Sequence, residues 1–171
     1  MSRRKPAQGI AERTAALFEE FQRTGNTGAL NSAIDLLGQA VDATPVNHPD
    51  RAMYLSNLGT ALGFRFGQTR RAADMDAAVT AYQQAVDTTP VGDPGRARYL
   101  FHLGLALRAR SAETRQAADL DAAISAFQQA VDATPASDPN RARYMSNLGM
   151  ALQDRLGTAG QARSKETRHG G

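Results

Sequence analysis

Acidic residues stand in pairs at two places in the chain, Asp74 with Asp76 and Asp119 with Asp121. Paired carboxylates can act as general acid and general base. Here each pair lies at the start of an apolar run with helical spacing, where a carboxylate can accept hydrogen bonds from unpaired backbone N–H groups and interact with the helix dipole. We therefore expect Asp74 and Asp119 to be helix N-caps, and neither pair to be catalytic.

Other side chains suited to catalysis are scarce. The chain has no cysteine and three histidines, His48, His102 and His169. Without cysteine there is no thiol nucleophile, disulfide or cysteine-ligated zinc, and three scattered histidines do not suggest a metal site. No phosphate-binding sequence of the GxxxxGK(S/T) type occurs, and no spacing suggests a Ser, His and acid group. We expect a protein that is not an enzyme and needs no cofactor or metal.

The composition is that of a soluble protein with a core, at 42% hydrophobic and 22% charged residues. The start lacks the apolar run of a signal peptide, and no 18 consecutive residues are apolar, so we expect a cytoplasmic protein without a membrane partner. Residues 3–5 carry +3 and residues 157–171 carry +2, so the total of +3 leaves −2 for residues 6–156. Basic ends on a slightly acidic body favour solvated tails over nucleic-acid binding.

The chain contains a repeated unit, and its helices would determine where any binding residues lie. Closely similar stretches end at Pro45, Pro90 and Pro135, at a constant interval of 45 residues, which is typical of a repeat array. Each stretch has apolar residues at i, i+3, i+4 and i+7, which predicts a helix. These residues are Leu30, Ala33, Ile34, Leu37, Ala40 and Val41, then Met75, Ala78, Val79, Tyr82, Ala85 and Val86, then Leu120, Ala123, Ile124, Phe127, Ala130 and Val131.

A second type of helix follows each proline after a short turn. Its apolar stripe is Leu55, Leu58, Gly59 and Leu62, then Leu100, Leu103, Gly104 and Leu107, then Met145, Leu148, Gly149 and Leu152. With a first helix over about residues 10–22, the alternation predicts an all-α fold of about seven helices over residues 10–156. Residues 1–9 and 157–171 are expected to be flexible.

The three glycines in register need a reason, because glycine inside a helix costs about 1 kcal/mol relative to alanine. We expect each to permit close approach of a neighbouring helix with no side chain between. Ala33, Ala78 and Ala123 would supply the small residue on the facing helix.

The pattern of residues 103–135 carries a family resemblance. Leu103 and Gly104 are adjacent, Ala123, Phe127 and Ala130 follow at spacings of four and three, and Pro135 comes five residues on. This pattern resembles tetratricopeptide repeats, although 45 residues exceeds the usual period of about 34. The extended units look like arrays found in actinobacterial proteins fused to caspase-like CHAT proteases, whose catalytic cysteine this chain lacks. The resemblance implies a right-handed α-solenoid of helix pairs.

In this family the first helix of each pair lines a concave groove, and its residues facing away from the second helix meet the ligand. Carried over by position, the candidate partner-binding residues are Asn57, Phe64, Arg98, Phe101, His102, Leu105, Arg108, Arg143 and Asn147, with Met53, Ser56, Thr60, Ser146 and Met150 beside them. Asn57, Arg98 and His102 fall where some relatives clamp a peptide carboxylate. Ala11 and Ala15 stand where a clamp lysine and asparagine would be expected.

Six arginines recur at the same positions of the repeat: Arg51, Arg96 and Arg141, and Arg65, Arg110 and Arg155. Residues that repeat identically are expected to pair with helix caps or backbone carbonyls. Ligand specificity should lie where the copies differ, which favours Arg98, Phe101, His102 and Arg108.

The sequence therefore predicts a non-catalytic interaction scaffold that binds a partner peptide or helix in the groove. Two alternatives remain open. In the first, the chain self-associates through its terminal helices. The last helix has no following partner, so Met145, Leu148, Leu152 and Leu156 would form an apolar edge, and the first helix is the other candidate. Alternatively, the chain is the recognition fragment of a larger effector or protease.

Overall fold

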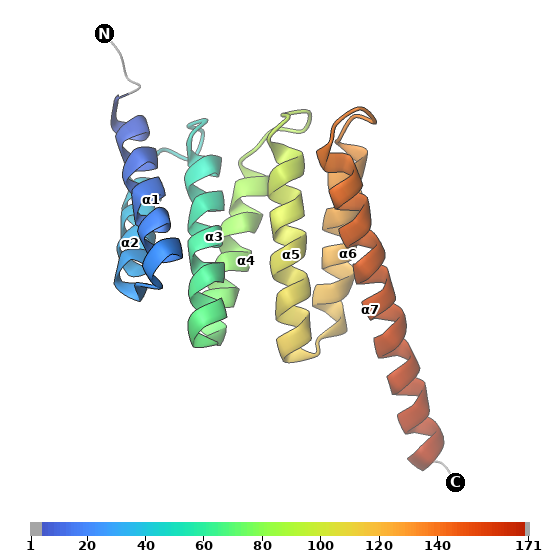
Figure 1. The fold of residues 1–171 in the computed structure, drawn as a ribbon. Helices are drawn as coiled ribbons and strands as arrows, with labels where there is room; N and C mark the ends of the chain where they lie inside the picture. Colours follow the sequence, from blue (N-terminus) through green and yellow to red (C-terminus); the bar gives the residue numbers. More distant parts are fainter. Residues whose placement is uncertain (1–4, 170–171) are drawn as a thin grey trace. The chain divides into compact units, whose positions relative to one another are not determined.

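The computed structural model describes residues 5–169, with side chains for residues 9–160. These residues form seven α-helices and no strands, so the predicted all-α class and number of helices are confirmed (Figure 1). The helices are α1 Lys5–Thr24, α2 Thr27–Ala43, α3 Arg51–Thr69, α4 Ala72–Asp87, α5 Arg96–Thr114, α6 Ala117–Asp132 and α7 Asn140–His169.

Packing divides the chain into two compact units, with unit 1 ending at Pro90 and unit 2 beginning at Val91. In unit 1, α1 packs on α2, α2 on α3 and α3 on α4. In unit 2, α5 packs on α6 and α6 on α7, with a smaller contact between α5 and α7. Within each unit, each helix thus packs on the next one along the chain, as expected for helices joined by short connections.

The prediction that Asp74 and Asp119 are N-caps is wrong. Helices α4 and α6 begin two residues earlier, at Ala72 and Ala117, so both aspartates lie inside the first turn. The helices that precede them end at Thr69 and Thr114, and the residues that follow, Arg70 and Arg115, have left-handed backbone with φ of 55° and 58°. Such a residue ends a helix sharply, and the next helix therefore starts sooner than the acidic residues suggest.

The first and last helices reach into the two segments that were expected to be flexible. Helix α1 begins at Lys5, within the segment 1–9. Helix α7 ends at His169, within the segment 157–171. That segment lacks apolar periodicity but contains Ala, Gln, Arg, Lys and Glu, which have high intrinsic helix propensity.

An aromatic ring lies over each of two repeated glycines. A Cβ at Gly59 would lie 2.9 Å from the ring of Tyr82, and one at Gly104 would lie 2.6 Å from the ring of Phe127. The glycines therefore make room for a ring of the next helix, which corrects the prediction of a contact with an alanine. Phe127 is fully buried there, because a hydrogen on Cα is the only substituent that leaves space for it.

Candidate functional site

The nine candidate residues are divided between the two units. Asn57 and Phe64 belong to α3 of unit 1, and the other seven belong to α5 and α7 of unit 2. Asn57 is half-buried. Phe64 is exposed on one side, while its ring lies 6.0 Å from the rings of Phe18 and Phe21 in α1. The structure thus gathers a candidate site only in unit 2.

Phe101 is a core residue, and its prediction as a surface contact is wrong. Its side chain is 4% exposed. The ring stacks on Tyr144 of α7 with 4.6 Å between centroids, and lies 5.8 Å from the ring of Phe127 of α6. Stacked rings at this distance stabilise a contact beyond the area that they bury. Phe101 and Tyr144 therefore fix α7 against α5.

His102 lies beside this aromatic pair, with its ring 5.9 Å from that of Phe101. Burial, followed by the positive charges of Arg98 and Arg143, lowers the pKa of His102 from 6.5 to about 4. Both causes disfavour the charged imidazolium. His102 is therefore neutral near pH 7, and its ring nitrogens can serve as one donor and one acceptor.

Arg98 and Arg143 supply the positive charge near His102. Arg98 is exposed, and its guanidinium lies 5.4 Å from the ring centre of Tyr99. The guanidinium of Arg143 lies 4.7 Å from the ring centre of Phe101, within cation–π distance. Among the described side chains, no carboxylate forms an ion pair with either arginine.

The other candidates extend along the same two helices. Leu105 and Met150 are exposed apolar side chains, 38% and 37% accessible. Arg108 of α5 forms an ion pair with Asp154 of α7, with 2.6 Å between Nε and Oδ2. Asn147 donates a hydrogen bond to the carbonyl of Arg143 at 2.9 Å. We call the set Arg98, His102, Leu105, Arg108, Arg143, Asn147 and Met150 the α5–α7 face.

Asp154 and Tyr144 belong to this site and were not among the candidates. Tyr144 recurs in the repeat as Tyr54 and Tyr99, so its identity gave no sign of a particular role. Asp154 lies one turn after Met150 on α7, and this helical spacing could have indicated it.

A pocket of about 980 Å³ opens at the turn end of unit 2, between the start of α5, the end of α6 and the start of α7. Arg98 and Arg143 line it. Asp93, Asp132 and Asp138 also line it, and each already accepts a hydrogen bond. Asp93 and Asp138 accept from a backbone N–H two residues further on, at 2.7 and 2.8 Å, and Asp132 accepts from the side-chain amide of Gln128 at 2.9 Å. One end of the α5–α7 face therefore opens into a hollow lined by two arginines that form no ion pair with these carboxylates.

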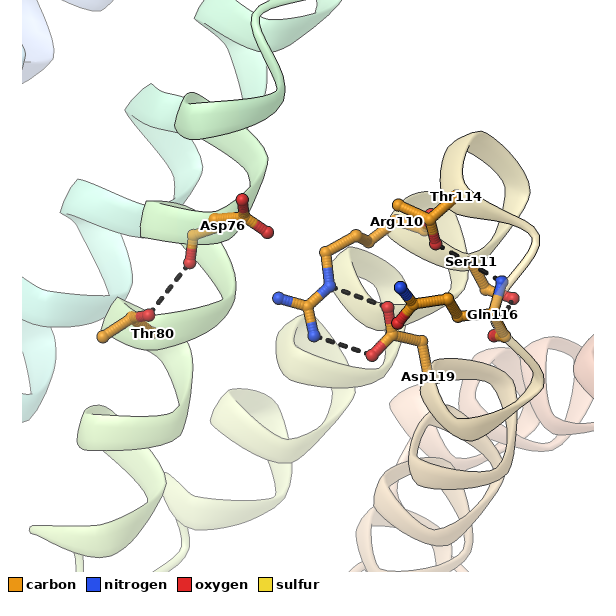
Figure 2. Close-up of polar contacts among 7 residues, drawn as sticks. All are labelled: Asp76, Thr80, Arg110, Ser111, Thr114, Gln116 and Asp119. Atoms are coloured by element: carbon orange, nitrogen blue, oxygen red, sulfur yellow. Dashed lines mark hydrogen bonds and ion pairs between the residues drawn. The ribbon is translucent and has the colours of Figure 1, made fainter.

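Four of the six recurring arginines pair with a buried carboxylate or with backbone carbonyls, in line with their predicted structural role. Arg110 pairs with the buried Asp119 through two hydrogen bonds of 2.7 Å, which Figure 2 shows, and Arg65 pairs with Asp74 in the same way. Two arginines donate to carbonyls at the end of the preceding helix, Arg51 to Val41 and Thr44, and Arg141 to Val131 and Thr134. These contacts brace neighbouring helices and leave the arginines little freedom to meet a ligand.

Within the part of the chain whose side chains are described, no three His, Cys, Asp or Glu residues gather closely enough to hold a metal ion. Over residues 5–169, none of the helices combines the length and the hydrophobicity needed to cross a membrane. The sequence matches no protein-family model and no curated protein.

Proposed function

We propose that the chain is a cytoplasmic, non-catalytic interaction module of the tetratricopeptide type, a right-handed α-solenoid that binds a segment of a partner protein on the α5–α7 face. The observation that carries this proposal is the pair of arginines, Arg98 and Arg143, which have no carboxylate partner and precede exposed Leu105 and Met150 by about two helical turns on the same helices. A folded protein usually pairs or disperses such groups, so a cationic end joined to an apolar strip is typical of a binding surface.

The dimensions of the face suit a short segment. Arg98 and Arg108 are ten residues apart on α5, which corresponds to roughly 15 Å along the helix axis. About five residues of extended chain, or about three turns of helix, would cover this length. The ion pair of Arg108 with Asp154 forms the end opposite to Arg98 and Arg143.

The charges indicate the chemistry of the bound segment. Two arginines without carboxylate partners favour an anionic group, either a side-chain carboxylate or a chain terminus, because guanidinium binds carboxylate through paired hydrogen bonds. Leu105 and Met150 favour an apolar side chain a few residues away. Neutral His102 adds a hydrogen-bonding group without adding charge.

The test is selection of peptides from a random display library on the purified full chain, followed by fluorescence anisotropy with the selected peptides. We expect acidic peptides with an apolar residue to be selected. Arg98→Glu and Leu105→Asp should each weaken binding about tenfold, which is a loss of about 1.4 kcal/mol. Both residues are exposed, so the helices should stay folded, which circular dichroism would check.

Arg13→Glu in α1 is the matched control, because Arg13 is also an exposed helical arginine and lies in unit 1. It should change binding by less than about twofold. Equal affinity of the selected peptides for all three variants would overturn the proposal, since the peptides would then bind elsewhere.

A further inference from the structure

The last repeated glycine has no ring over it. Nothing lies within 4 Å of the position that a Cβ of Gly149 would occupy, whereas Gly59 and Gly104 in the same register are covered by Tyr82 and Phe127. The two covered glycines show what this position of the helix accepts, which is the flat face of an aromatic ring from the following helix. Helix α7 therefore has an open space above Gly149 that such a ring could fill, and we call this space the glycine seat.

The apolar residues around this seat are exposed as well. Met145, Leu152 and Leu156 are 53%, 46% and 74% accessible. Their counterparts in α5 are all buried, and these are Leu100, Leu107 and Ser111. We call the set Met145, Leu148, Gly149, Leu152 and Leu156 the terminal stripe. It is the surface that α5 buries against α6, presented by α7 without a cover.

Arg155 lies beside the stripe, and its guanidinium favours an acidic group on whatever binds there. Arg65 binds two partners at once, Asn31 through Nη1 at 3.0 Å and Asp74 through Nε and Nη2 at 3.0 and 2.6 Å. Arg155 has the same register and donates to Asp121, the counterpart of Asn31, through Nε at 2.5 Å and Nη2 at 3.5 Å. Asp121 thus takes the edge of the guanidinium that Asp74 takes in Arg65. A guanidinium has five N–H donors, so the N–H groups of Arg155 that Asp121 does not use can bind a second carboxylate.

We infer that the terminal stripe is a docking site for one amphipathic helix of the α4 and α6 type, supplied by a partner protein. The helix places an aromatic ring over Gly149 and an acidic residue eight positions earlier against Arg155. That spacing is the one between Asp74 and Tyr82 and between Asp119 and Phe127. This site is separate from the α5–α7 face and does not depend on the function proposed for it.

A second copy of α7 fits the stripe less well. Tyr144 is the only Phe or Tyr in α7, and it is buried against Phe101. An interface between two α7 helices would leave both glycine seats without a ring. It would also leave Arg155 without a second carboxylate in the spacing described above, because no Asp or Glu stands eight positions before Tyr144. Shape and charge complementarity thus favour an acidic, aromatic helix over a second copy.

The chain itself provides the probe. A fluorescent peptide with the α6 sequence, residues 117–132, would be held helical by a side-chain lactam between positions 125 and 129, which are both exposed. Binding to the full chain would be followed by anisotropy. We expect saturable binding that weakens about tenfold for the peptide with Phe127→Ala and for the peptide with Asp119→Asn.

The decisive variant of the protein is Gly149→Ala. Its methyl group would occupy the seat of the ring, so the peptide should bind about tenfold more weakly, although the helix itself gains stability. Gly157→Ala is the matched control, because Gly157 also lies in α7 with nothing within 4 Å. It should leave binding within about twofold of the wild type.

Three results would overturn the inference: no binding of the peptide, equal binding to the Gly149→Ala and Gly157→Ala proteins, or a dimer formed through the terminal stripe. The dimer would be seen by light scattering at several concentrations. If Leu152→Asp disperses it and the α6 peptide does not compete with it, a second copy covers the stripe in place of a partner helix.

Discussion

Helices α5 and α7 are two copies of one helix with different neighbours. Both have Arg-Ala-Arg-Tyr near their start and both carry the Leu-Gly pair, yet the apolar stripe of α5 is buried by α6 and that of α7 is exposed. The apolar pattern therefore shows which side of a helix can be buried, while burial itself depends on the following helix. A repeat of this kind gains stability chiefly at the contact between neighbouring helices.

The largest expected difference in the free energy of unfolding is between leucines at the same position of the repeat, Leu107 in α5 and Leu152 in α7. Leu107→Ala should lower the free energy of unfolding by about 2–5 kcal/mol, because it leaves a cavity between α5 and α6. Leu152→Ala should lower it by less than about 0.5 kcal/mol, because Leu152 is largely exposed. Denaturant unfolding followed by circular dichroism measures both. Similar losses in the two variants would mean that the stripe of α7 is covered in solution.

Alanine substitutions at the repeated glycines should change the stability by smaller amounts, and with opposite signs at Gly104 and Gly149. Gly104→Ala should destabilise the chain by roughly 1–3 kcal/mol, because its Cβ would lie 2.6 Å from the Phe127 ring and the ring must move. Gly149→Ala should stabilise it by up to about 1 kcal/mol through helix propensity alone. Thermal unfolding of both variants measures the difference. A loss of stability in Gly149→Ala would show that something already occupies the seat.

The smallest expected effect is a change of stability with pH, and it comes from His102. The other two copies of the repeat have Asn57 and Asn147 at this position. Because the pKa of His102 is lowered from 6.5 to about 4, the unfolded chain binds more protons between these pH values. Stability from this group is present above pH 6.5 and is lost as the pH falls towards 4. The loss should be on the order of 1 kcal/mol, allowing for solvent screening.

His102→Asn introduces the residue of the other two copies and removes this loss. Unfolding by denaturant at pH 7 and pH 5, compared between wild type and variant, isolates the histidine, since the carboxylates contribute to both proteins. An identical pH dependence of the two proteins would contradict the lowered pKa.

Spacing in the sequence was a good guide to the helices and their buried sides. The positions of Leu100, Leu107, Ala123 and Phe127 within a helical period predicted that they would be buried, and they are. The repeated arginines were predicted to be structural because they do not vary between copies, and Arg65 and Arg110 pair with buried aspartates. Both conclusions rest on regularities that a single sequence contains.

The candidate site was predicted less well. Phe101 lies outside the stripe that α5 turns towards α6, so its spacing suggested an exposed residue. Its burial depends on Tyr144, which is 43 residues away in the sequence and stacks on it across the α5–α7 contact. The N-caps were misplaced because the left-handed Arg70 and Arg115 shorten the turn, and arginine gives no sign of that backbone conformation.

The sequence by itself determined the repeat of 45 residues, the number of helices and the side of each helix that is apolar, since these follow from periodicity along one chain. Only the tertiary structure decided that a ring rather than an alanine lies over Gly104, that Phe101 belongs to the core and that Gly149 is open. The reason is physical. Periodicity is a local property of one helix, whereas burial, pairing and the lowered pKa of His102 depend on which other helices lie against it.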